Sequence, residues 1–163
     1  MSERSERALR KTNSSDSLHS FCSYFIKNAP RFARCSLCHD IDHPGNTNSF
    51  EIAMDTELSR LHSDDSVLER HHSATTLNLL NNSATNILGS MKKADVIDIR
   101  NVVIKAILGT DMGLHAKLLG DLVTREPGCF DSIDGDNMNA ELIESYIAIV
   151  MHTSDLSANC LPR

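Results

Sequence analysis

The chain has 163 residues, of which 40% are hydrophobic, and a mean hydropathy of −0.24, as expected for a soluble globular protein rather than a disordered one. No apolar run approaches the roughly 20 residues that a membrane-spanning helix needs, so we expect no membrane span. Residues 1–17 are polar and lack the apolar stretch of a secretory signal. We therefore expect a cytoplasmic protein whose five cysteines are reduced.

Charge is distributed unevenly along the chain. Residues 1–34 carry seven basic and three acidic side chains, a net charge of +4, whereas the rest of the chain carries −10. We interpret residues 1–34 as a basic arm and residues 35–163 as the body of the domain. An acidic body argues against nucleic acid as a partner, because binding phosphate groups needs a dense basic surface.

Apolar residues recur at helical spacing, and no alternating strand pattern competes with them. Ser66 and Glu69 have the spacing of a capping box at a helix start. We expect an all-α fold with a loop at residues 129–139. The helical segments, in chain order, are residues 50–61, 66 to about 82, 95–108, 114–123 and 140–151. The clearest apolar stripe is Val96, Ile99, Val103 and Ile107.

The run Cys35-Ser-Leu-Cys38-His39 satisfies the C-x-x-C-H pattern of covalent haem attachment and also resembles half of a zinc knuckle. Haem attachment requires an export route, and a zinc knuckle requires a second pair of ligands. Cys129 and Cys160 are far apart in sequence and do not form such a pair. Two small, partly buried thiols before a turn are the favoured interpretation.

Histidine and aspartate are concentrated in a few polar clusters. His39 and Asp40 are adjacent, and His43 follows shortly after them. An adjacent His and Asp can bind one metal ion, and the second carboxylate oxygen can reach another, as in two-metal sites. Two further clusters are the pair His71-His72 and, one helical turn apart near the carboxyl end, His152 and Asp155.

Four ordered motifs between residues 38 and 157 resemble the signature of class I 3′,5′-cyclic-nucleotide phosphodiesterases. This resemblance implies an all-helical metal phosphohydrolase of cyclic-nucleotide signalling, which hydrolyses cAMP or cGMP to the 5′-monophosphate. The motifs are His39-Asp-Ile-Asp-His43-Pro-Gly45 with Asn48 and Phe50, Ser66-Val-Leu-Glu-Arg-His-His72, Ile107-Leu-Gly-Thr-Asp-Met112 with His115, and His152-Thr-Ser-Asp-Leu-Ser157.

The resemblance also implies roles for individual residues. His39, Asp40 and Asp155 correspond to ligands of a Zn²⁺ ion, and Asp40 also bridges to a Mg²⁺ or Mn²⁺ ion. A water held between two such cations is activated for attack on phosphorus. The positions that hold the water ligands of the second ion are His43, Glu69, His72 and Thr110, and the substrate contacts are Asp40, Asn48, Met112 and Asp155.

The family's first motif, a Tyr-His-Asn run that supplies a fourth ligand and the general acid, is absent from its expected place. Ser17-Leu-His19-Ser resembles its second half, but Ser15 then occupies the general-acid position, so the general acid is unassigned. Arg70 and Ala158 stand where the family has Asn, and the chain ends before the family's purine-selecting Gln. We expect part of a catalytic domain, truncated at both ends and impaired in turnover.

Two alternatives share some of these residues. One is a non-catalytic metal- or nucleotide-binding module, or a regulatory pseudoenzyme, that retains part of the metal site. The other is a generic His-Asp metal phosphohydrolase, which would share the ligands but not the motifs around Glu69 and Thr110. The sequence is compatible with a homodimer and does not specify which purine is preferred.

Overall fold

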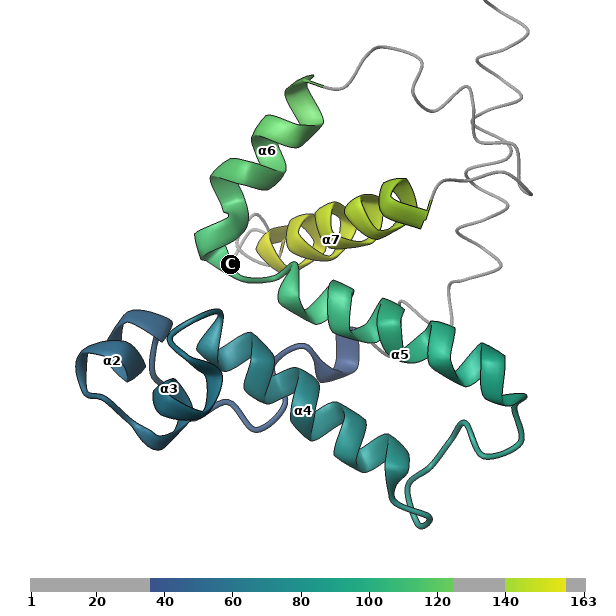
Figure 1. The fold of residues 1–163 in the computed structure, drawn as a ribbon. Helices are drawn as coiled ribbons and strands as arrows, with labels where there is room; N and C mark the ends of the chain where they lie inside the picture. Colours follow the sequence, from purple (N-terminus) through teal and green to yellow (C-terminus); the bar gives the residue numbers. More distant parts are fainter. Residues whose placement is uncertain (1–35, 125–139, 158–163) are drawn as a thin grey trace, which may run out of the picture.

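The computed structural model describes residues 36–124 and 140–157, and this part of the chain contains helices and no strand, which confirms the all-α prediction (Figure 1). Residues 36–38 form a helical turn. The basic arm, His19, Cys35, the loop at 129–139, Ala158 and Cys160 lie outside the described residues. The elements are α2 (Asn48–Ala53), α3 (Glu57–His62), α4 (Val67–Asn81), α5 (Lys93–Leu108), the 3-10 turn η1 (Met112–Leu114), α6 (His115–Thr124) and α7 (Ala140–Ser157).

Helix α5 is central to the described fold. It packs against α4 on one side and α7 on the other, while α2 and α3 lie near the start of α4 (Figure 1). The predicted stripe on α5 is confirmed, because Ile99, Val103 and Ile107 are fully buried and Val96 packs against them. The remaining members of this core are Leu88, Ala106, Ile147 and Met151. Burying such side chains is the main favourable term in folding.

The turn after α5 fits closely against α7. A Cβ atom added to Gly109 would lie 2.7 Å from the Cα and 2.8 Å from the Cβ of Ala148. Real Cβ atoms do not approach so closely, so glycine is required by this crossing rather than by its backbone angles. The contact holds the turn that carries Thr110 against the helix that carries Asp155.

The prediction of one helix across residues 50–61 is wrong, because α2 ends at Ala53 and α3 begins at Glu57. Asp55 between them has a φ of +47°, and the hydroxyl of Thr56 caps α3 by accepting from the N–H of Ser59 at 3.3 Å. The apolar positions that suggested a continuous stripe include Phe50 and Leu61, which are exposed. The left-handed conformation of Asp55 and the cap at Thr56 therefore divide the segment into two helices, although its apolar residues have the spacing of one.

The predicted capping box is also wrong, although α4 begins where it indicated. Ser66 has a φ of +44° and makes no cap hydrogen bond. Its hydroxyl instead donates to Oδ2 of Asp111 at 2.7 Å. A tertiary contact has taken the side chain away from its own helix.

The other helix boundaries differ by a few residues. Helix α5 begins two residues before the predicted Asp95, and a 3-10 turn replaces the predicted start at Leu114. Helix α7 continues past the predicted end at Met151 to Ser157, so His152 and Asp155 lie on a regular helix. Among the described helices, none combines the length and apolar character needed to span a bilayer.

Candidate metal centre

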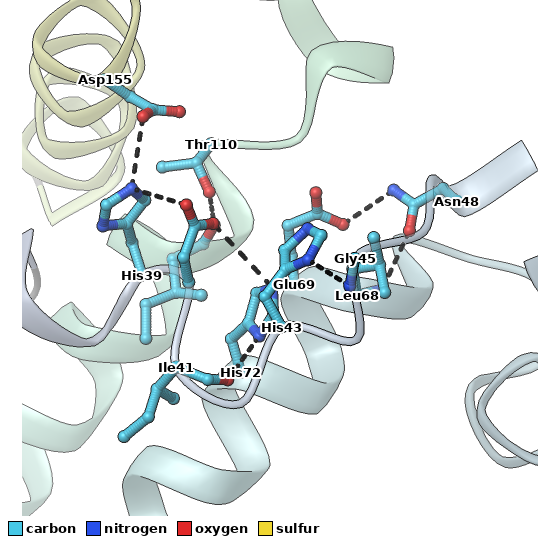
Figure 2. Close-up of polar contacts among 12 residues, drawn as sticks. His39, Ile41, His43, Gly45, Asn48, Leu68, Glu69, His72, Thr110 and Asp155 are labelled. Atoms are coloured by element: carbon cyan, nitrogen blue, oxygen red, sulfur yellow. Dashed lines mark hydrogen bonds and ion pairs between the residues drawn. The ribbon is translucent and has the colours of Figure 1, made fainter. Parts of the chain in front are cut away.

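The three predicted ligands of the first ion meet at the ring of His39. Its Nε2 atom lies 3.3 Å from Oδ2 of Asp40 and 3.2 Å from Oδ1 of Asp155, which is 116 residues away in the sequence (Figure 2). The Nδ1 atom of His39 is 2.8 Å from the carbonyl oxygen of Ser36. A carbonyl only accepts, so Nδ1 carries a proton, and in the neutral ring Nε2 directs its lone pair towards the two carboxylates.

This donor set fits a divalent cation. Imidazole nitrogen and carboxylate oxygen bind Zn²⁺ at about 2.0–2.2 Å, which places neighbouring ligand atoms roughly 3–3.5 Å apart. The distances from Nε2 of His39 to the two carboxylates fall in this range. Three unprotonated acceptor atoms directed at one another repel, and either a proton on Nε2 of His39 or a metal ion between them removes that repulsion.

A second group adjoins the first through Asp40. Donor atoms of Asp40, His43 and His72 all lie within 4.8 Å of one another. Oδ1 of Asp40 is 4.0 Å from Nε2 of His72, whereas Oδ2 is the oxygen next to His39. The two oxygens of Asp40 therefore face two different polar groups, one at His39 and one at His43 and His72, which is the arrangement that a carboxylate bridging two cations needs.

Hydrogen bonds give His43 and His72 opposite roles. The buried His72 donates from Nδ1 to the carbonyl of Ile41 at 2.7 Å, so its Nε2 is left as an acceptor facing Asp40. His43 accepts the backbone N–H of Gly45 on Nδ1 at 2.9 Å, so its Nε2 carries a proton. The two rings stack with their centroids 5.4 Å apart. His43 can donate to a water but not bind a metal through Nε2, whereas His72 can accept.

Glu69 and Thr110 lie on elements that adjoin this centre. Glu69 is half-buried in the first turn of α4, and burial raises the pKa of its carboxyl group, an effect that a hydrogen bond from Asn48 partly offsets. Thr110 is buried, and its hydroxyl donates to the carbonyl of Ile107 at 2.7 Å. The Thr110 oxygen therefore retains acceptor capacity.

Comparison with known proteins identifies the family. Residues 21–163 match the family model of the 3′5′-cyclic nucleotide phosphodiesterases. The chain belongs to this family.

Among curated relatives of this chain, the Drosophila melanogaster 3′,5′-cyclic-AMP phosphodiesterase, isoform F, is 44% identical over 93 residues, which are 57% of this chain and 14% of that protein. The Rattus norvegicus 3′,5′-cyclic-AMP phosphodiesterase 4C is 32% identical over 134 residues, 78% of this chain and 24% of the relative. The chain thus spans less than a quarter of the length of either relative.

A solved structure has a similar fold. The phosphodiesterase domain of the RhoPDE fusion protein from the choanoflagellate Salpingoeca rosetta superposes with a TM-score of 0.69 and 28% sequence identity. The similarity covers 79% of this chain and 40% of that one.

The two remaining predicted substrate contacts lie apart from the ligand groups. Met112 is exposed at the start of η1. Asn48 is the first residue of α2, and both polar atoms of its side chain bind the first turn of α4 (Figure 2). The structure therefore places the five predicted histidines and aspartates close together: His39, Asp40, His43, His72 and Asp155. Glu69 adjoins them from the first turn of α4.

Several supporting groups were not found from the sequence. The carbonyls of Ser36 and Ile41 orient two of the histidines, and backbone carbonyls have no signature in a sequence. His152 was noted beside Asp155, but it donates from Nδ1 to the carbonyl of Gly109 at 3.0 Å and contacts His115 at 2.9 Å. It thus links α7, the turn after α5 and the start of α6.

Two histidines of the chain make its stability sensitive to pH. Burial is the main cause that lowers the pKa of both His62 and His72 below the ordinary value of about 6.5. Nε2 of His62 is buried without a hydrogen-bond partner. Below pH 6.5 the unfolded chain therefore binds more protons than the folded chain at these positions. The stability that they contribute is present above pH 6.5 and is lost as the pH falls.

We expect a lower free energy of unfolding at pH 5.5 than at pH 7.5, measured by urea denaturation with a chelator present. His62→Leu removes one of the two groups and should reduce this difference. The raised pKa of Glu69 acts in the opposite direction and is unchanged in the variant. An identical pH dependence in the original chain and H62L would contradict the role of His62.

Proposed function

We propose that this chain forms part of a catalytic domain that hydrolyses 3′,5′-cyclic nucleotides to 5′-monophosphates with two divalent cations. The observation that carries the proposal is the convergence of His39, Asp40 and Asp155 from distant parts of the sequence. The curated relatives are named for cyclic AMP, so cAMP is the first candidate substrate and cGMP the second.

In this proposal His39, Asp40 and Asp155 hold Zn²⁺, and Oδ1 of Asp40 faces the site of Mg²⁺ or Mn²⁺. When bound, the two cations acidify a shared water and neutralise charge on the phosphoryl oxygens. The chain contributes a fixed set of donors that needs little reorganisation, because carbonyl hydrogen bonds already orient the rings of His39 and His72.

The remaining residues orient water and substrate. His43 offers an N–H donor at Nε2, while His72 and Glu69 offer acceptors, so together they can bind waters in a defined orientation. Thr110 adds a hydroxyl oxygen at the turn held against α7. Met112 provides an exposed apolar surface for the nucleotide, and Asp40 and Asp155 would contact its phosphate through the cations that they hold.

We expect the 163-residue chain by itself to show little or no hydrolysis of cAMP or cGMP with Zn²⁺ and Mg²⁺ added. A general acid must protonate the leaving oxygen, and Ser15 cannot do so at neutral pH, because a hydroxyl is far too weak an acid. The measurement is release of the 5′-monophosphate over time. Turnover near that of an intact phosphodiesterase would contradict the proposed impairment.

A non-catalytic nucleotide-binding module is the second candidate, and the absence of the general-acid motif from its expected place in this sequence favours it. Such a module would bind cAMP tightly, without releasing product, and would lose binding in Asp40→Ala. Equilibrium dialysis with labelled cAMP and metal ions distinguishes the two candidates. Weak binding with at most slow product release supports the impaired catalytic domain, and tight binding without product supports the module.

A further inference from the structure

Helix α4 obtains its N-terminal cap from a distant residue. Oδ1 of Asn48 accepts the N–H of Leu68 at 2.9 Å, at the second position of the helix, where a cap side chain normally binds. Ser66, the local candidate, is engaged by Asp111 instead. Asn48 therefore caps α4 from 20 residues upstream.

The same carboxamide also holds Glu69. Its Nδ2 atom donates to Oε2 of Glu69 at 2.9 Å, at the helix position where a capping-box glutamate would turn back to bind Ser66 (Figure 2). Since Asn48 serves both as the cap and as the partner of Glu69, the glutamate is not needed at the helix end. Its carboxylate stays half-buried in the electrostatic field of Asp40 and Asp111.

We propose that Asn48 is a positioning residue that holds the Glu69 carboxylate at the candidate metal centre. This inference rests on the proposed function, in which Glu69 orients the waters of a bound cation. Asn48 is itself fixed at the first position of α2, because the side chain of the preceding Thr47 caps that helix by accepting the N–H of Phe50. The link therefore runs from a capped helix start to the glutamate.

One substitution separates the two contacts of Asn48. Asn48→Asp retains an oxygen that can accept the N–H of Leu68, so the cap is preserved. It replaces the amide donor facing Glu69 with a second carboxylate, so attraction becomes repulsion. Adding Glu69→Gln supplies a donor from the other side and restores a hydrogen bond between the two side chains.

The first experiment measures the energetic coupling between Asn48 and Glu69 in the absence of metal ions. Melting temperatures of the full chain, N48D, E69Q and N48D/E69Q are compared by circular dichroism in the presence of a chelator. We expect N48D to melt at a lower temperature than the full chain and N48D/E69Q to recover part of the loss. A double variant that melts no higher than N48D would overturn the pairing of Asn48 with Glu69.

The second experiment measures Mn²⁺ affinity by isothermal titration calorimetry. We expect N48D to bind Mn²⁺ at least 10-fold more weakly, as is typical when a group that supports a metal site is lost. The control is Asn101→Asp, which makes the same charge change on the exposed side of α5 and should leave the affinity unchanged.

The outcomes distinguish a failure of this inference from a failure of the proposed function. Equal affinities of the original chain and N48D would overturn the inference alone. An original chain that binds no Mn²⁺ would overturn the proposed function together with the role of Asn48 in it. A loss of affinity in N101D equal to that in N48D would show a general charge effect and would also overturn the inference.

Discussion

Asp40→Ala is expected to weaken the binding of Zn²⁺ and Mn²⁺ by at least 100-fold, the largest effect of any single substitution at the site. Its two oxygens face the two groups of ligand atoms, one 3.3 Å from His39 and the other 4.0 Å from His72. Loss of a supporting residue already costs 10–100-fold in metal affinity, and Asp40 would be a ligand to both ions. Isothermal titration calorimetry measures both affinities directly.

The matched control is Asp42→Asn, two residues further along the same turn. Asp42 is also exposed, and its carboxylate pairs with His71 at 2.9 Å outside both ligand groups. We expect D42N to bind both metals within about two-fold of the original chain, because it removes one surface charge and asparagine tolerates the φ of +59° at this position. The side chain of Asp40 is 62% exposed, so D40A should fold normally by circular dichroism. Equal losses in D40A and D42N would contradict the assignment of Asp40.

Gly109→Ala should lower the free energy of unfolding more than any other substitution proposed here, and it should also weaken metal binding at the site. The added Cβ would lie 2.7 Å from the Cα of Ala148, so α5 and α7 would have to separate at their crossing. Inserting a methyl group into a packed interior costs about 1–3 kcal/mol. Because α7 carries Asp155, we also expect weaker Zn²⁺ binding. Urea denaturation and metal titration of the same variant measure the two effects.

Gly120→Ala is the control for this substitution. Gly120 lies within α6, and an added Cβ would meet no atom within 4 Å. Alanine is a better helix former than glycine by about 0.8–1 kcal/mol, so G120A should be neutral or more stable, with unchanged metal binding. If G109A proved as stable as G120A, the close contact at the α5–α7 crossing would not be a structural constraint.

The parts of the fold that could be predicted are those that depend on short-range pattern. The stripe on α5 follows from helical spacing, and the buried Ile99, Val103 and Ile107 confirm it. The break after Ala53 could not be found in this way, because the apolar spacing continues across it. It depends on the local conformation of Asp55 and the cap from Thr56, which that spacing does not encode.

The candidate site shows the same division. Motif order identified the His and Asp residues that converge, although spacing alone could not bring Asp155 to His39 across 116 residues. The pattern at Ser66 indicated the start of α4, but its cap is supplied by Asn48. Ser66 does not cap α4 because its hydroxyl donates to Asp111 instead, and a local sequence motif cannot predict such a tertiary hydrogen bond.

We propose that His39, Asp40 and Asp155 bind one divalent cation. X-ray diffraction at the zinc absorption edge, from crystals of this chain grown with Zn²⁺, tests it most directly. We expect an anomalous peak within bonding distance of Nε2 of His39 and of oxygens of Asp40 and Asp155. An anomalous map with no peak there, or with zinc bound only at other residues, would contradict the claim.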